Sequence, residues 1–146
     1  MPVRTEVITN QHAIVEAIKQ FQSGARKIWY ACVEASLPAF SMGTVKEGYV
    51  AAKKRGVEIR YITEITKYNL PYCLEIMQLV ELRHLGSVTG NFALSESEYI
   101  AGTLKGNSLV SLVRTDVQEI VYQQHLIFQT LWDNSQPASD RITKIR

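Results

Sequence analysis

The hydrophobic positions of the first half of the chain switch between a period of two and a helical period, which predicts alternating strands and helices. Residues 27–33 are apolar on both alternating faces, as expected for a central strand that helices cover on both sides. Further strands are predicted over 5–9, 57–62 and 81–85, with helices that begin at Asn10 and Asn69 and a single helix over 41–55. This β-α-β order predicts parallel pairing with right-handed crossovers.

The pattern changes in the second half, where short apolar segments are separated by polar turns. Residues 88–94, 99–103 and 108–114 are predicted to be strands joined as hairpins. Thr115 and Gln118 match a capping box, which predicts a helix with a broad apolar stripe on one face up to Trp132. The expected fold class is therefore α/β, with a mixed, mainly parallel sheet flanked by helices.

The pattern contains no internal repeat and no internal linker, so it predicts a single domain over 1–134. Residues 134–137 interrupt the long helix. The polar segment that follows has helical propensity and no stop signal. We therefore expect 135–146 to be the start of a linker helix that leads to further modules.

Composition and charge narrow the possible partners. The chain has 146 residues, 46% hydrophobic and 21% charged, with a formal net charge of +2. A dedicated nucleic-acid binder is usually far more basic, so nucleic acid is an unlikely partner. No apolar segment approaches the roughly 18 residues of a membrane span, and residues 1–6 lack the apolar core of a signal peptide. With Cys32 and Cys73 in apolar contexts typical of buried free thiols, these features predict a cytoplasmic location.

Candidate chemistry is concentrated at predicted strand ends. The three histidines lack the spacing of a metal site, and no phosphate-binding loop or dinucleotide motif occurs, so no metal or cofactor is expected. Since α/β folds place ligand crevices at the carboxyl ends of strands, one crevice could collect the polar residues found there. Those residues are Thr63, Glu64, Arg83, His84, Thr89 and Asn91. The alternative, equally open, is that Thr63, Glu64 and Thr66 only cap the next helix.

The segment 53–63, Lys-Lys-Arg-Gly-Val-Glu-Ile-Arg-Tyr-Ile-Thr, resembles the helix, Arg-Gly-Val, strand signature of phospholipase D-like domains. The strand 80–85 also fits that superfamily, whose catalytic motif is His-x-Lys-x4-Asp followed by Gly-Ser. Aligned to it, this chain has Thr89, Asn91, Glu96 and Gly102-Thr103. The resemblance implies a fold with a single repeat. Because Thr and Asn replace the nucleophilic His and the charge-neutralising Lys, we expect this segment not to be an enzyme, and we name no catalytic residue.

A narrower resemblance covers nearly the whole chain. It rests on 60–66 (Arg-Tyr-Ile-Thr-Glu-Ile-Thr), 83–85 (Arg-His-Leu), 90–92 (Gly-Asn-Phe) and the helix residues Gln123, Gln124, Phe128, Leu131 and Trp132. The chain is similar to the sensory domain of archaeal, especially thaumarchaeal, sensor histidine kinases. The resemblance implies a regulatory input domain of a two-component system that signals to kinase or other sensory modules through a homodimer.

The expected ligand is small and possibly anionic. Its predicted site consists of Arg60, Thr63, Glu64, Arg83, His84, Thr89 and Asn91. Three alternatives remain open. The chain could be a weak phosphodiesterase-like domain in which Glu64 or Glu96 orients His84 as nucleophile or base. It could also be a nucleic-acid-binding module, or a dimerisation module without a ligand that uses the apolar stripe of 117–132.

Overall fold

A computed structural model describes residues 4–146, so part of the N-terminal segment used above to argue against a signal peptide lies outside the described residues. Eight strands and six helices follow one another along the chain. In order they are β1 (Thr5–Ile8), α1 (Gln11–Gly24), β2 (Ile28–Val33), α2 (Leu37–Gly43), α3 (Lys46–Lys54), β3 (Glu58–Thr63), α4 (Leu70–Ile76), β4 (Glu81–His84), β5 (Asn91–Ser95), β6 (Tyr99–Lys105), β7 (Ser108–Thr115), α5 (Gln118–Asp133), β8 (Gln136–Pro137) and α6 (Ala138–Ile145).

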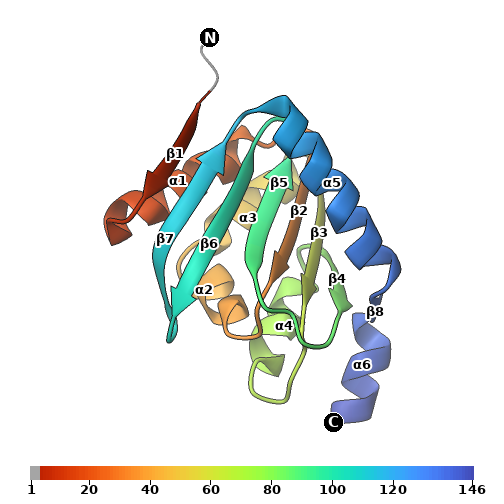
Figure 1. The fold of residues 1–146 in the computed structure, drawn as a ribbon. Coiled ribbons are helices and arrows are strands. Elements are labelled where there is room, and N and C mark those ends of the chain that lie inside the picture. Colours follow the sequence, from red (N-terminus) through yellow and green to blue (C-terminus); the bar gives the residue numbers. More distant parts are fainter. Residues whose placement is uncertain (1–3) are drawn as a thin grey trace.

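All eight strands form one open sheet in the order β1-β7-β6-β5-β2-β3-β4-β8 (Figure 1). The pairs β2–β3 and β3–β4 are parallel, and the other five pairs are antiparallel. The predicted fold class, a mixed α/β sheet flanked by helices, is confirmed. Parallel pairing is less extensive than expected, because the hairpin strands β5 to β7 and the edge strands β1 and β8 all join in the antiparallel sense.

The two faces of the sheet carry separate cores. The larger core contains residues of α1 to α4 and α6. On the opposite face, α5 packs on a smaller core (Figure 1). Its buried members are Tyr30, Cys32, Ile62, Leu94, Phe128 and Trp132. Within residues 4–146, no helix combines the length and the apolar character needed to cross a membrane.

Two predicted helix boundaries are wrong. The single helix over 41–55 is two helices, because Pro38 opens α2 earlier and the chain leaves helical geometry at Val45 before α3 begins. The Thr115 capping box does not form either. The Thr115 hydroxyl instead hydrogen-bonds to the Thr5 hydroxyl and accepts from the Val117 N–H, so α5 begins at Gln118.

The C-terminal segment packs against the rest of the domain. Gln136 and Pro137 form β8, which pairs with β4, and Ala138 and Ile142 of α6 are buried in the larger core. Residues 135–145 therefore extend the structural unit past the predicted boundary at 134. Continuation of α6 towards further modules stays a prediction.

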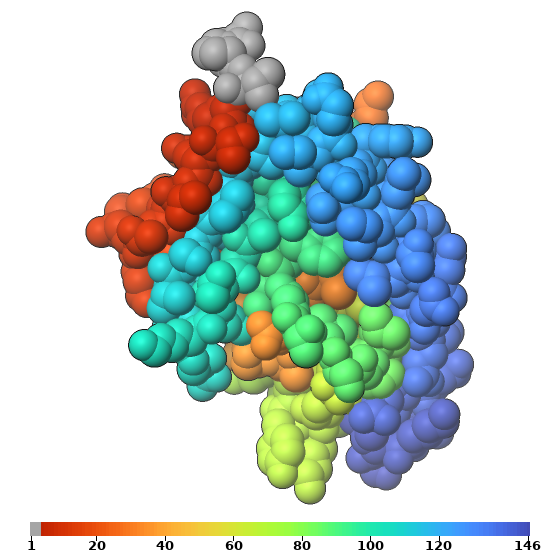
Figure 2. All heavy atoms as spheres, viewed as in Figure 1, coloured from red at the N-terminus to blue at the C-terminus, as the bar shows by residue number. Residues whose placement is uncertain are grey.

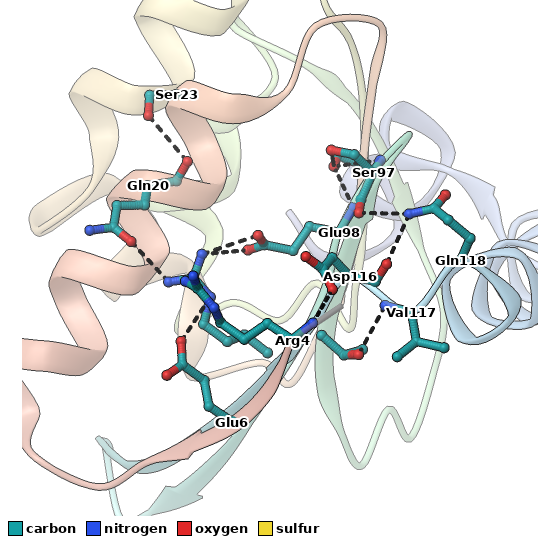
Figure 3. Close-up of polar contacts among 12 residues, drawn as sticks. Arg4, Glu6, Gln20, Ser23, Ser97, Glu98, Asp116, Val117 and Gln118 are labelled. Carbon is teal, nitrogen blue, oxygen red and sulfur yellow. Dashed lines mark hydrogen bonds and ion pairs between the residues drawn. The ribbon is translucent and has the colours of Figure 1, made fainter. Parts of the chain in front are cut away.

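A polar cluster fixes β1 to the sheet on the α1 side. The Arg114 guanidinium of β7 donates to Gln20 Oε1 of α1 at 2.9 Å and to both carboxylate oxygens of Glu98 at 3.1 and 3.2 Å. Its Nε lies 3.6 Å from Glu6 Oε1 of β1. Figure 3 shows Glu6, Gln20 and Glu98 arranged around this point. One arginine thus links β1, α1 and the residue before β6.

Candidate functional site

The carboxyl ends of the parallel strands bring Thr63 and His84 together. The two residues are register partners on β3 and β4, and His84 is in turn paired with Gln136 of β8. Both follow the larger-core residues Tyr61 and Leu82 by two positions, so both side chains lie on the face covered by α1 to α4. The Thr63 hydroxyl is buried and has no hydrogen-bond partner within residues 4–146.

His84 is held in one tautomer by the chain that follows β3. Its side chain is 6% exposed, and Nδ1 accepts a hydrogen bond from the Ile65 N–H at 2.9 Å. The neutral ring therefore carries its proton on Nε2, where no hydrogen bond is made within the described chain. Burial lowers the pKa of His84, the charges of Arg141 and Lys144 lower it further, and Glu64 opposes them. The imidazole is thus a neutral donor.

The lowered pKa of His84 predicts a pH-dependent stability. The unfolded chain takes up a proton on this imidazole at pH values where the folded chain does not. The free energy of unfolding should therefore fall as the pH drops below about 6.5, the ordinary histidine value, and this loss should continue down to the folded pKa.

Urea titrations at several pH values between 5 and 8 test this expectation. The matched control is His84→Gln, whose amide oxygen can still accept from Ile65 but does not titrate. The variant should show a shallower loss of stability over this range than the wild-type protein. Equal slopes would show that His84 is not the source of the pH dependence.

The loop after β3 is hydrogen-bonded to the segment before α2 and to α6, and it leads directly into α4. The buried Asn69 amide nitrogen donates to the carbonyls of Ala35 and Glu64, each at 2.9 Å, and its oxygen accepts from Thr66 N–H at 2.8 Å. From α6, Arg141 Nε donates to the Ile65 carbonyl at 3.0 Å. The loop next to His84 is therefore in direct contact with the C-terminal helix. Figure 2 shows α4, the loop before β5 and α6 gathered at this end of the molecule.

Of Thr63, Glu64 and Thr66, which could have capped the helix that follows β3, only Thr66 hydrogen-bonds to the turn before that helix. Its hydroxyl accepts from the N–H groups of Tyr68 and Asn69 in the turn before α4. Thr63, by contrast, is buried inside β3 and makes no such bond within residues 4–146. Glu64 is half-buried and contributes its charge near His84.

Asn91 lies at the same edge of the sheet, where β5 begins beside the end of β2. Its side-chain oxygen accepts from the Glu34 N–H at 2.9 Å, and its amide nitrogen donates to the Glu34 carboxylate. This pair joins the end of β2 to the start of β5. Thr89, two residues earlier, is exposed in the loop before β5.

Arg60 and Arg83 lie on the opposite face of the sheet, against α5. The Arg60 guanidinium lies 4.9 Å from the Trp132 ring centre and 5.2 Å from that of Tyr30. Arg83 lies 5.2 Å from Trp132 and donates to the hydroxyl and the carbonyl of Ser135 at 2.7 and 2.6 Å. The structure therefore divides the predicted crevice between two faces, because Arg83 and His84 are consecutive in a strand.

Glu96 anchors the opposite end of β2. Its carboxylate accepts from the N–H groups of Arg26, Lys27 and Ile28 at 2.9 to 3.1 Å. Burial alone would raise the pKa of Glu96, but these donors outweigh it and the pKa is lowered. Glu96 is separated from the carboxyl edge by the length of β2, about 17 Å, and does not orient His84.

Sequence reasoning missed three residues of this edge. Glu34 follows the central strand as a single polar residue, and Asn69 reads as a helix start, so both carried a detectable but ambiguous signal. Arg141 is 76 residues away from its partner Ile65, and nothing local in the sequence indicates that contact.

Comparison with known proteins identifies the fold. No protein-family model and no curated protein sequence matches the chain. Among solved structures, NucT from Helicobacter pylori aligns with a TM-score of 0.78 at 11% identity, covering 93% of this chain and 99% of that one. Nuc from Salmonella typhimurium, a phospholipase D family member, aligns with a TM-score of 0.72 at 14% identity, covering 93% and 97%. The chain has a phospholipase D-like fold.

A third neighbour has a different role. TrmBL2, an archaeal chromatin protein that binds DNA, aligns with a TM-score of 0.73 at 16% identity over 92% of this chain. The chain spans about half of TrmBL2, 54% of its length. Nucleic acid is therefore not excluded as a partner of a protein with this fold.

These neighbours contradict the prediction that the segment is not an enzyme. That prediction rested on the identities of Thr89 and Asn91. The structural comparison instead covers nearly the full length of both this chain and a phospholipase D family member. We therefore do not keep the prediction.

Proposed function

We propose that the chain is a ligand-binding input domain of a signalling protein, in which a small anionic ligand binds at the carboxyl edge around His84 and Thr63. The observation that carries the proposal is the contact between this edge and the C-terminal segment. Arg141 of α6 donates to the Ile65 carbonyl, and the Ile65 N–H donates to His84.

Unused polar groups support a ligand at this edge. The Thr63 hydroxyl and the His84 Nε2 hydrogen both lack partners within residues 4–146. A buried polar group without a partner typically costs about 1–3 kcal/mol, so a ligand that supplies a partner to the Thr63 hydroxyl is favoured. The positive charges of Arg141 and Lys144 near His84 favour an anion, while Glu64 limits the net charge.

The route from ligand to output runs along β4 and the loop before α4. β8 pairs with β4 at two positions, and Arg83 of β4 binds Ser135 just before β8. A ligand that binds one arrangement of this edge more tightly than another would therefore shift α6 and the end of α5. Such differential affinity is the physical requirement of a sensor.

The homodimer and the kinase context belong to the same proposal. On the face of the sheet that carries α5, Val7 and Val113 are register partners, and Val7 is 67% exposed. On α5 itself, Tyr122, Leu126 and Ile127 are also exposed. An apolar face of this kind suits a two-fold contact with a second copy. The sensor histidine kinase context comes from the sequence resemblance, and the cytoplasmic location comes from the composition of the sequence; both are part of this proposal.

Thermal unfolding with inorganic phosphate, AMP, glycerol phosphate and a short DNA duplex tests the proposal. A ligand at 100 times its dissociation constant should stabilise the chain by about 2.7 kcal/mol. We expect a saturable shift with a small anion that is smaller in His84→Ala and kept in Lys105→Gln, an exposed charge change on β6. A shift with DNA alone would favour a nucleic-acid-binding module, and no shift with any probe would contradict the proposal.

The variant Arg83→Ala separates binding from output. Because Arg83 lies on the α5 face, the ligand-induced shift should be retained, whereas ligand-induced protection of the amides of 135–145 against hydrogen exchange should be lost. Loss of binding itself in Arg83→Ala would place this residue in the ligand site. Unchanged protection would show that Arg83 does not connect the edge to α6.

The shared fold favours phosphodiester hydrolysis at the same edge as a second candidate function, since Nuc is a phospholipase D family member. His84 does not fit the role of nucleophile or base, because its lone pair on Nδ1 is engaged by the Ile65 N–H. Hydrolysis of bis-p-nitrophenyl phosphate by the wild-type chain, lost in Asn91→Ala, would support this function. Absence of hydrolysis at any pH between 5 and 9 would contradict it.

A further inference from the structure

A concave site lies away from the carboxyl edge, between α1 and α3. It is a groove of about 630 Å³. Small-molecule sites typically measure about 300–1,000 Å³, so the groove has the size of a metabolite site. The space exists because α3 contributes Gly48 and Ala51, two of its smallest residues, to the wall that faces α1.

Positive charge is concentrated in this groove. Lys19 of α1, Lys46 at the start of α3 and Arg55 at its end line it, with Glu47 as the acidic member. Three positive charges and one negative charge give +2, which equals the formal net charge of the whole chain. The groove therefore favours an anion.

Arg55 is held in place without being neutralised. Its Nη2 donates to the carbonyls of Gln22 and Ala25 at 2.9 and 2.8 Å, and both acceptors are uncharged main-chain groups. The other guanidinium nitrogens make no hydrogen bond within residues 4–146. Lys46 pairs with Glu75, but both side chains are well exposed, at 42% and 36%, so this pair is weak and Lys46 can turn to a ligand.

The floor of the groove contains a buried amide with an unused acceptor. Gln22 is 2% exposed, and its Nε2 donates to the Val45 carbonyl at 3.1 Å. Its Oε1 receives no hydrogen bond within the described chain, and it lies where a Cβ on residue 48 would stand 1.9 Å away. Glycine at position 48 thus keeps this oxygen at the wall of the groove, where it can accept from a ligand hydroxyl or amine.

We propose that the groove between α1 and α3 binds a small phosphate monoester. Its phosphate is held by Arg55, Lys19 and Lys46, and a hydroxyl or amine of the same molecule donates to Gln22 Oε1. Arginine suits this role because its planar fork matches the geometry of a phosphate and its charge is permanent. This site is independent of the one proposed around His84.

Isothermal titration of the wild-type chain with AMP, ribose 5-phosphate and inorganic phosphate tests the proposal, with adenosine as the control without a phosphate. We expect saturable binding of a phosphate monoester and none of adenosine. Lys19→Gln and Arg55→Gln should each weaken it by about tenfold, the scale of one charge-assisted contact. Lys105→Gln, the same charge change at a residue that does not line the groove, should leave the affinity unchanged.

Three results would overturn the proposal. One is the absence of saturable binding by any phosphate monoester, and another is an equal loss in Lys105→Gln. The third is binding to phosphatidic acid vesicles without binding to free monoesters, which would assign the positive charge to a lipid surface. His84→Ala separates the two sites, because it should remove only the binding at the carboxyl edge and leave the binding that Lys19→Gln and Arg55→Gln weaken. Loss of binding in His84→Ala would transfer the ligand to the carboxyl edge.

Discussion

Replacing Phe128 by alanine should lower the free energy of unfolding by about 3–5 kcal/mol, the range found for large aromatic residues in cores. Phe128 is fully buried and stacks on Tyr30 and Trp132, with ring centres 5.0 and 5.9 Å apart. It is the centre of the smaller core, so its loss removes most of the contact that holds α5 to the sheet. Urea unfolding of the purified chain measures the effect.

Leu126→Ala on the same helix is the matched control for Phe128→Ala. Leu126 is 53% exposed, so its removal should cost well under about 1 kcal/mol. A similar loss in both variants would mean that burial in the smaller core does not determine the effect, since alanine favours the helix at both positions. A loss below about 1 kcal/mol in Phe128→Ala would show that α5 is not held by this core.

Replacing Arg114 by leucine should cost about 2–3 kcal/mol, somewhat less than the loss of one partner from a fully buried ion pair. The Arg114 side chain is 13% exposed, and Glu98 is 22% exposed, so the remaining carboxylate is only partly rehydrated. The same change releases Gln20 and Glu6, which loosens β1. Urea unfolding measures the loss, and hydrogen exchange of the β1 amides should show faster opening.

A double-mutant cycle with Glu98→Gln isolates the ion pair. The double variant should be more stable than the sum of the two single losses predicts, because the second change removes the unpaired carboxylate. Additive losses would show that Arg114 acts through Gln20 and Glu6 rather than through Glu98.

The strands were predictable because the apolar residues of each strand are distributed in a recognisable way over the two faces of the sheet. The central strand 28–33 is apolar on both faces, and its flanking cores lie where that pattern places them. The break between α2 and α3 was not predictable from periodicity, since Val45 and Tyr49 keep helical spacing across it and both are buried. The antiparallel pairing of the edge strands β1 and β8 could not be predicted from local sequence either, because both strands are short and pair with strands far away in sequence.

The residues predicted for the candidate site lie on both faces of the sheet. Consecutive residues of a strand point to opposite sides, so the separation of Arg83 from His84 was readable in the sequence. The contacts of Arg60 and Arg83 could not be predicted from the sequence. Both side chains lie against Trp132 of α5, which is about 50 to 70 residues further along the chain. Arg141 and Asn69 likewise act through contacts that only the folded chain makes.

The pairing of β1 with β7 has a consequence for the order in which the protein is completed. Thr5 and Thr115 are register partners 110 residues apart, so the first strand to be synthesised waits for one of the last. At about 5–20 residues per second, this interval is roughly 5–20 s on the ribosome. During that time β7 has not yet been synthesised, so β1 has no strand to pair with and Glu6 lacks its partner Arg114. Folding of β1 is therefore a late event that requires the chain to be synthesised at least as far as β7.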